Sequence, residues 1–390
     1  MFLEKYVTKI QESRSLNSIK DAINKMAYVN IALALFIFVF YQFDQAGKIQ
    51  EAMRTQALMM YQLYCIMLAV SLSYLIAKAV LNETVDESFR MSTVFLALLP
   101  GIILIPNGFA TTFPIITMPV AVILAIFFNK LDAFKIQRKR LPQAVVDYYN
   151  RLWPVFVMMA FMFVFIFIFN RSFIYLANGI IIVTNALSGI VAILILIVII
   201  CMFWVLGIHG VGVIGTLMRP FWFHMMIVNG YMILGGALPV YLGTETFFGW
   251  CVWIGGSGCT LGLTINMLMA KSNHLKQLGK DCAPSNIFNI NENIIFGTPI
   301  VNNKYFTIPF FLAPILTGIV AYSSMKLGYV SVPSIVAPWV IPMPLGLFIS
   351  TLGDFRSLIL AFVLIAITTL IYYPFFKMYD RSLVKEEFEH

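Results

Sequence analysis

Two ionisable side chains in the second half of this sequence stand in apolar surroundings. His209 follows a long apolar run in WVLGIHGVGV (204–213), and Glu292 lies in FNINENIIFG (288–297). A charged group inside an apolar segment is costly unless it is paired or reaches a wet cavity, so both residues are candidates for a functional site. The alternatives are a structural histidine bonded to a backbone carbonyl and a loop-end carboxylate in solvent.

Polar side chains accompany Glu292. Asn289, Asn291 and Asn293 flank it, and Ser257 in GGSGCT adds a hydroxyl and a backbone that a ligand can approach closely. Several amides beside one carboxylate form a set of donors and acceptors that suits sugar hydroxyls. Small residues such as those around Ser257 equally serve tight helix packing. The set predicts a polar ligand, and a sugar fits it best.

Two tryptophans lie beside backbone that glycine or proline interrupts. Trp204 precedes GIHG, and Trp339 lies in APWVIP. An aromatic face packs well against the apolar C–H face of a sugar, which makes both residues candidates for a sugar site. The alternative for each is a tryptophan of the membrane interface.

The elements that position these side chains are expected to be membrane helices. The chain has 390 residues, of which 60% are hydrophobic and 11% charged, against about 45–50% and about 25% in soluble domains. This composition excludes a soluble globular enzyme and a disordered chain. The net charge of +8 comes from short basic stretches between apolar runs, without interleaved stacking aromatics, so no nucleic-acid partner is expected. The five cysteines form no CxxC pair, so we expect no metal site.

We predict an all-α integral membrane protein, because its apolar runs approach the roughly 20 residues that a transmembrane helix needs. About ten such runs occur. They cover roughly 26–43, 57–81, 91–106, 109–129, 153–174, 186–206, 221–242, 247–270, 305–324 and 357–375. The segments 207–242 and 329–352 are candidates for partly re-entrant paths.

Basic residues predict the orientation, because cytoplasmic loops collect lysine and arginine. They cluster in residues 1–25, in the loop 130–151, in 271–280 and in the tail 376–390. Residues 1–25 also alternate apolar and basic side chains, as an amphipathic helix at the membrane surface does. Both termini are therefore predicted to lie in the cytoplasm.

The apolar runs in the second half of the chain are less continuous than those in the first half. Glycine, proline and polar residues interrupt the apolar runs repeatedly beyond residue 205. Irregular backbone at membrane depth is tolerated where it is buried in protein or lines a cavity, and transporters build their central sites from such broken helices. The second half is therefore predicted to bind the ligand.

A series of motifs resembles the membrane subunit, enzyme IIC, of bacterial sugar phosphotransferase systems, in the branch for lactose, cellobiose and diacetylchitobiose. They follow one another along most of the chain in the order found in that family. They are FLEKYVTKI, KRLPQAVVDYYNRLWP (139–154), WVLGIHG (204–210), GGSGCTLGL, MLMAKSNHLKQLGK (267–280), FNINENIIFGTPIVNN and the APW element (337–339).

The resemblance implies a homodimer with a dimer-interface domain at 26–175 and a sugar-binding domain at 186–375 that has two re-entrant hairpins. It also implies that Glu292 and His209 contact the 6-hydroxyl of the sugar and that Trp204 and Trp339 line its site. Asn293 departs from the family pattern, which usually has proline after the glutamate.

The predicted function is that of a permease subunit in the bacterial cell membrane. It binds and translocates a β-linked disaccharide of the cellobiose, diacetylchitobiose or lactose type. The 6-hydroxyl then attacks the phosphorus of the phosphocysteine of a separate enzyme IIB. Enzyme IIA is the indirect partner that supplies the phosphoryl group to enzyme IIB. Glu292 is predicted to accept the hydroxyl proton and His209 to orient the oxygen, with no cofactor. The alternatives are a proton-coupled secondary sugar transporter and a membrane enzyme that acts on lipid.

Overall fold

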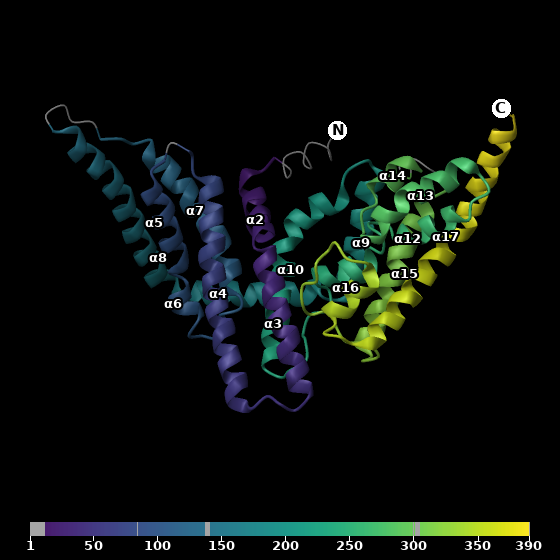
Figure 1. Cartoon of the computed structure of the whole chain (residues 1–390). Helices are drawn as coiled ribbons and strands as arrows, with labels where there is room; N and C mark the ends of the chain where they lie inside the picture. The colour runs from purple at the N-terminus through teal and green to yellow at the C-terminus, as the bar shows by residue number, and fades with distance from the viewer. Residues whose placement is uncertain (1–11, 84, 137–140, 299, 301–304, 390) are drawn as a thin grey trace. The chain divides into compact units, whose positions relative to one another are not determined.

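Helices are the regular elements of this protein, as the sequence predicts. The computed structural model describes residues 12–83, 85–136, 141–298, 300 and 305–389, and no β-strand occurs among them (Figure 1). Part of the predicted amphipathic lead-in, residues 1–11, lies outside the described residues, as do three of the basic residues of the loop 130–151. The chain forms two compact units, each built from several separate segments.

The first unit comprises residues 1–28, 50–184 and 219–227. Its helices are α2 (Arg14–Lys25), α4 (Glu51–Val80), α5 (Glu87–Leu98), α6 (Gly101–Leu104), α7 (Phe113–Asp132) and most of α8 (Gln143–Leu187). Helix α4 packs against α2, α5 and α7. A buried apolar cluster joins several of these helices, with Ala69, Leu104, Phe113, Ile116, Phe173 and Ala177 at its centre.

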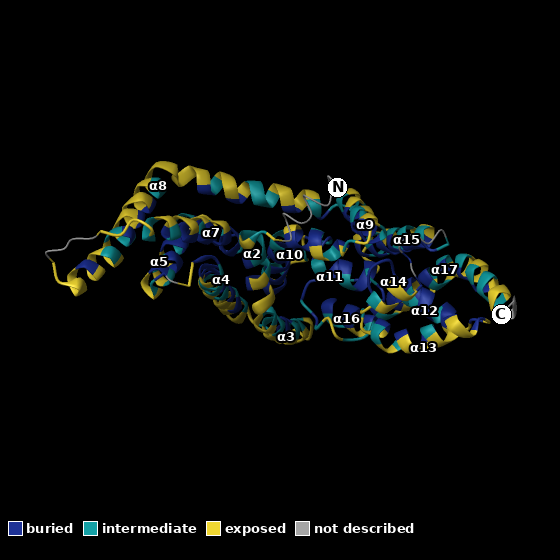
Figure 2. Ribbon diagram, turned by 90° about the horizontal axis from the view of Figure 1, so that it is seen from above, coloured by how far each residue is buried: buried dark blue, intermediate teal, exposed yellow. Residues whose placement is uncertain are grey.

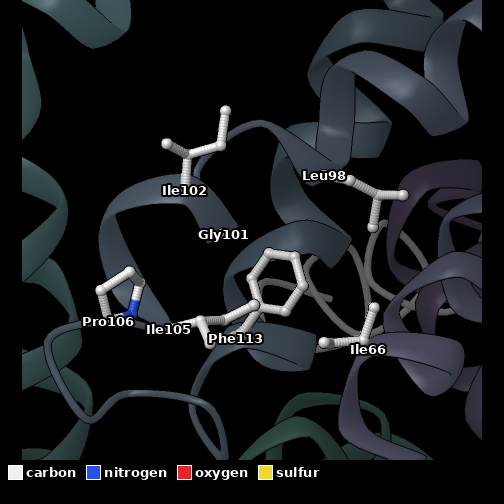
Figure 3. A pocket seen from close by; sticks show the side chains of 7 residues that line it. All are labelled: Ile66, Leu98, Gly101, Ile102, Ile105, Pro106 and Phe113. Carbon is white, nitrogen blue, oxygen red and sulfur yellow. The ribbon is translucent and has the colours of Figure 1, made fainter. Parts of the chain in front are cut away.

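An open apolar groove of about 350 Å³ lies in the first unit, where α5 gives way to α6 (Figure 3). It is lined by Ile66, Leu98, Gly101, Ile102, Ile105, Pro106 and Phe113. None of these side chains carries a hydrogen-bonding group, so the groove does not suit a sugar, whose hydroxyls need polar partners when they leave water.

The second unit comprises residues 29–49, 185–218 and 228–390 and contains both His209 and Glu292. Most of α3 (Ala27–Gln45) belongs to it, while α10 (Gly210–Leu234) contributes its two ends here and residues 219–227 to the first unit. The other helices are α9 (Ile190–Val205), α11 (Glu245–Phe247), the π-helical turn η1 (Phe248–Val252), α12 (Leu261–Leu268), α13 (Asn273–Ile287), α14 (Glu292–Gly297), α15 (Thr307–Lys326), α16 (Met343–Ser350) and α17 (Phe355–Glu389).

Eight helices among the described residues are long and apolar enough to cross a membrane. They are Ala27–Gln45, Glu51–Val80, Glu87–Leu104, Phe113–Asp132, Gln143–Leu187, Gly210–Leu234, Thr307–Lys326 and Phe355–Glu387, and Ile190–Val205 is a shorter apolar helix. Figure 2 shows that α8 is exposed along much of its length. A continuous exposed apolar surface of this kind is unfavourable in water and suits lipid, so the chain is a multi-pass membrane protein.

The predicted span at 247–270 is wrong as a continuous helix. The structure divides it into α11, η1 and α12, with the turn 253–260 between the last two. Gly255, Gly256 and Gly258 have positive φ angles in this turn, which a regular helix does not accommodate. By contrast, the segment 207–242 contains one continuous helix, α10, although its sequence left a re-entrant path open.

Helix α17 extends beyond the predicted span 357–375 and ends at Glu389. Its last turns bind the beginning of α13. The carboxylate of Asp380 accepts hydrogen bonds from the backbone N–H groups of Lys271 and Ser272, and Glu387 accepts one from the Ser272 hydroxyl at 2.6 Å. These bonds satisfy donors around the start of α13 that have no partner inside the helix.

Asp354 anchors the beginning of α17. Burial alone would raise the pKa of its carboxyl, but hydrogen bonds from Arg356 and Ser331 outweigh it and lower the pKa to about 2. The Arg356 guanidinium binds both carboxylate oxygens at 2.9 Å, and the Ser331 N–H donates at 2.8 Å. The carboxylate therefore stabilises the fold fully above the usual aspartate pKa of about 4, and this contribution is lost as the pH falls through about 2.

We expect Asp354→Asn to lower the stability of the protein at neutral pH by about 1 kcal/mol, because the neutral amide weakens both the helix cap and the arginine pair. Thermal unfolding of the purified protein in detergent checks this, with Asp281→Asn as a control at an exposed position on α13 of the same unit. An unchanged unfolding temperature would show that the carboxylate contributes nothing beyond what an amide supplies.

Candidate functional site

His209 lies at the junction of α9 and α10, where it caps the beginning of α10. Its Nδ1 accepts a hydrogen bond from the backbone N–H of Gly212 at 2.9 Å. Because Nδ1 is the acceptor, the proton of the neutral ring is on Nε2. The junction is tight, since a Cβ on Gly210 would lie 2.2 Å from the carbonyl oxygen of Ile200. Glycine at this position therefore lets the chain turn and brings the imidazole to the end of α9.

Trp204 belongs to the last turn of α9 and contacts His209 directly. The two ring centroids are 4.4 Å apart, with an angle of 47° between the ring planes. Trp204 is only 4% exposed, and its indole Nε1 has no hydrogen-bond partner. A buried donor without a partner is costly, and a ligand that supplies an acceptor removes that cost.

Glu292 is the first residue of α14, and its carboxylate faces the imidazole of His209. The distance from Glu292 Oε1 to His209 Nε2 is 3.9 Å, and the two side chains are 47% and 50% exposed. This separation is too long for a direct hydrogen bond. It leaves space for an oxygen about 2.8 Å from both atoms, which accepts from Nε2 and donates to the carboxylate. The structure therefore brings together the two ionisable residues that the sequence singled out.

Asn289 and Asn291 hold the turn between α13 and α14 in place. Asn289 has a φ of +61° and ends α13 in the left-handed conformation that asparagine tolerates well. Its Oδ1 accepts from the N–H of Gly255 at 2.9 Å. The Nδ2 of Asn291 donates to the carbonyl of Ser257 at 2.8 Å and to Thr260 Oγ1 at 3.0 Å. Both amides thus bind the turn 253–260.

The glycines of the turn 253–260 allow this close approach. A Cβ on Gly256 would lie 2.3 Å from Cγ of Asn291, and the φ of Gly256 is +93°. The hydroxyl of Tyr372, on α17, holds the same turn through a 2.7 Å bond to the carbonyl of Gly258. The glycine-rich turn 253–260 therefore packs against the turn between α13 and α14, residues 288–291, which we call the Glu292 turn.

The other predicted residues occupy different environments. Ser257 is buried in the turn 253–260 and takes part through its carbonyl. Trp339 is 65% exposed in the segment that precedes α16, and none of the contacts that define the His209–Glu292 pair involves it. Asn293 is exposed in the first turn of α14, where a backbone N–H needs no partner inside the helix. Asparagine in place of the usual proline is therefore compatible with the helix starting here.

Sequence reasoning missed the buried residues Asn286 and Thr264, and it gave Tyr372 no role. Asn286 is completely buried, and its amide bonds to the backbone and to two threonine hydroxyls. The sequence carried a weak signal for it, since Asn286 continues the series of asparagines toward α13. Nothing local, however, indicated that its partners lie 22 to 31 residues earlier.

Comparison with known proteins identifies the family. The family model described as "Phosphotransferase system, EIIC" matches residues 22–314, about three quarters of the chain. The chain belongs to this EIIC family. Residues 22–314 include Trp204, His209, Ser257 and Glu292, but not Trp339.

Several relatives are named for the sugars lichenan, cellobiose and lactose. The lichenan permease IIC component of Bacillus subtilis (strain 168) is 39% identical over 186 residues, 47% of this chain and 41% of the relative. The cellobiose-specific EIIC component of Geobacillus stearothermophilus is 37% identical over 189 residues, 47% and 42% of the two chains. The lactose-specific EIICB component of Staphylococcus haemolyticus (strain JCSC1435) is 28% identical over 291 residues, 72% and 49%. The matched segments thus span less than half of each relative.

A solved structure shares the fold over its whole length. The crystal structure of the transporter ChbC, the IIC component from the N,N'-diacetylchitobiose-specific phosphotransferase system, superposes with a TM-score of 0.80 and covers 99% of both chains. The two sequences are 24% identical. The predicted fold class, an all-α membrane protein with the architecture of an EIIC transporter, is confirmed by this match.

Proposed function

We propose that this EIIC protein binds a β-linked disaccharide of the cellobiose, diacetylchitobiose or lactose type and carries it across the bacterial cell membrane. It then presents the 6-hydroxyl of the sugar to the phosphocysteine of an enzyme IIB protein. The observation that carries the proposal is the 3.9 Å separation of Glu292 and His209, which suits one hydroxyl oxygen. The relatives named for lichenan, cellobiose and lactose support the sugar class.

The pair performs two parts of a phosphoryl transfer. His209 Nε2–H donates to the hydroxyl oxygen and orients it, while Glu292 accepts the hydroxyl proton as the oxygen attacks phosphorus. The bond between the cysteine sulfur and phosphorus breaks, and the new oxygen–phosphorus bond forms. The rate of such a transfer depends mainly on positioning and on charge stabilisation, which the paired side chains provide.

The hydrogen bonds of the other candidate residues indicate which of them contact the sugar and which hold the site in place. We assign Trp204 to the sugar, because its ring adjoins His209 and its Nε1–H lacks an acceptor. Trp339 stays a candidate for the apolar face of the sugar. Asn289 and Asn291 act by holding the Glu292 turn, since their amides already bind the protein. Ser257 takes part through its backbone.

We further propose that the protein is a homodimer with both termini in the cytoplasm. The basic residues near the beginning and the end of the chain support this orientation. The partner in the transfer is phosphorylated enzyme IIB, recharged by enzyme IIA. The lactose relatives named EIICB are consistent with a close association between this subunit and the phosphoryl donor.

Equilibrium binding and product formation test the proposed function. We expect saturable binding of one radiolabelled disaccharide out of cellobiose, diacetylchitobiose and lactose to the purified protein. The unlabelled disaccharides should compete in the order of their affinities. Sugar phosphate should appear only when phosphorylated enzyme IIB is added.

Two other outcomes would contradict this function. Accumulation of unmodified sugar in proteoliposomes under a proton gradient, without any phosphoryl donor, would establish a secondary transporter. Turnover of a lipid by the isolated protein would establish a membrane enzyme. Both assays use the same reconstituted preparation. A positive result in one assay shows that the preparation is functional, so a negative result in the other assay is meaningful.

A further inference from the structure

Asn286 is a fully buried polar side chain near the end of α13, and every hydrogen-bonding group of its amide is used. Its Nδ2 donates to the carbonyl of Gly255 at 2.6 Å and to Thr260 Oγ1 at 3.0 Å. Its Oδ1 accepts from the Thr264 hydroxyl at 2.9 Å. A polar group that is buried and fully bonded in this way specifies one arrangement of the segments it joins.

The bonds of Asn286 lead to Glu292 through a short series of contacts. Thr260 Oγ1 accepts from the amides of both Asn286 and Asn291, at 3.0 Å each. Asn291 is the residue directly before Glu292, and its carbonyl accepts the N–H groups of Ile294 and Ile295 at 3.0 Å, which begins α14. The Thr260 hydroxyl thus connects the end of α13 to Asn291, the residue directly before α14.

The backbone provides a second connection between the same elements. The carbonyl of Asn286 accepts the N–H of Asn289 at 3.0 Å, and Oδ1 of Asn289 accepts the N–H of Gly255 at 2.9 Å. The fit around the Asn286 amide is tight, because a Cβ on Gly255 would lie 2.7 Å from its Oδ1. The Glu292 turn is therefore held at several points against the turn 253–260.

We propose that Asn286 is a positioning residue for Glu292 in the phosphoryl transfer, an inference that rests on the proposed function. Its amide holds the turn 253–260 and the Glu292 turn in the arrangement that sets the carboxylate 3.9 Å from His209 Nε2. No apolar side chain supplies both the donors and the acceptor, and an aspartate lacks the two N–H groups. Displacement of a reacting group by about 1 Å is enough to lower a rate about 100-fold.

Steady-state kinetics with phosphorylated enzyme IIB test this role. We expect Asn286→Ala to lower kcat about 30-fold or more while the dissociation constant of the disaccharide changes less than about threefold. Thr264→Val removes the hydroxyl that bonds Oδ1 of Asn286 and the carbonyl of Thr260 at the start of its own helix, and we expect about a fivefold loss of kcat. Thr368→Val is the matched control, because the Thr368 hydroxyl is buried in the same unit but bonds within its own helix, to Ile365.

A double-mutant cycle separates positioning from general structural support. In a Glu292→Asp background, which retains a carboxylate and a measurable rate, we expect Asn286→Ala to cost less than about a further threefold, because its effect acts through the carboxylate. The same loss in both backgrounds would overturn the proposal. Parallel losses of binding and kcat in proportion to the folded fraction would also overturn it. If Asn286→Ala does not fold, Thr264→Val is carried through the same cycle with the same criteria.

The cycle also distinguishes failure of this inference from failure of the proposed function. If the wild-type protein with phosphorylated enzyme IIB forms no sugar phosphate, the proposed function is overturned and the inference with it. If the wild type forms product and Glu292→Asp slows it, while Asn286→Ala and Thr264→Val leave kcat unchanged, only the positioning role is overturned.

Discussion

Replacing Glu292 with glutamine should lower the rate of sugar phosphorylation by about 100-fold or more while much of the sugar binding remains. The amide keeps the size of the side chain and can still hydrogen-bond a hydroxyl, but it cannot accept the hydroxyl proton. General base catalysis contributes typically about 100- to 10,000-fold, so the loss should fall in this range. The measurement compares kcat for phosphorylation by phosphorylated enzyme IIB with the equilibrium dissociation constant of the disaccharide.

Asp281→Asn is a suitable control for this variant, since it makes the same carboxylate-to-amide change at an exposed site on α13. The Asp281 carboxylate bonds the Gln277 side chain of its own helix. We expect this variant to keep the wild-type rate. Product formation at nearly the wild-type rate by Glu292→Gln would remove Glu292 from the proton transfer, whatever its effect on binding.

His209→Asn should lower the phosphorylation rate by about 100-fold with little change in stability. The Oδ1 of asparagine can take the place of Nδ1 and accept the N–H of Gly212, so the cap of α10 survives. The Nε2–H that faces Glu292 is lost, and the hydroxyl is then oriented by one group instead of two. Phosphorylation kinetics and thermal unfolding, measured on the same preparation, check the two parts of this prediction.

His209→Ala is the informative companion, because it removes the cap and the Nε2 donor together. It should show the same loss of rate and an additional loss of about 1 kcal/mol of stability. His274→Asn makes the same change at an exposed position near the beginning of α13, and we expect it to leave both quantities unchanged. A nearly normal rate in His209→Asn would mean that His209 serves only to cap the helix.

Much of the fold was accessible from the sequence, because a membrane imposes a strong constraint on composition. A bilayer offers no hydrogen-bond partners, so a spanning segment has to be helical and apolar over about 20 residues. Runs such as those in α4, α7 and α15 satisfy this condition by themselves. The predicted span at 247–270 failed because glycines in its middle adopt positive φ angles, and average hydropathy does not register them.

The two ionisable residues of the candidate site could also be singled out from the sequence, because of the apolar composition of the chain. An ionisable residue in an apolar chain is conspicuous whatever the fold, so His209 and Glu292 could be singled out individually. The resemblance to the enzyme IIC family predicted that they act together, and the structure places them 3.9 Å apart. Their 83-residue separation in the chain contains no local pattern from which that distance follows.

The sequence by itself determined the class of environment and the helical architecture, and it singled out the two ionisable side chains of the candidate site, since these depend on residue types and on local spacing. Tertiary structure alone decided what the amides do. Asn289 and Asn291 have the composition of sugar ligands, yet their hydrogen bonds go to the turn 253–260. Asn286 became significant only once α12 and α13 were packed together. A hydrogen bond depends on atoms brought within about 3 Å, and packing between distant segments, rather than their order along the chain, supplies that proximity.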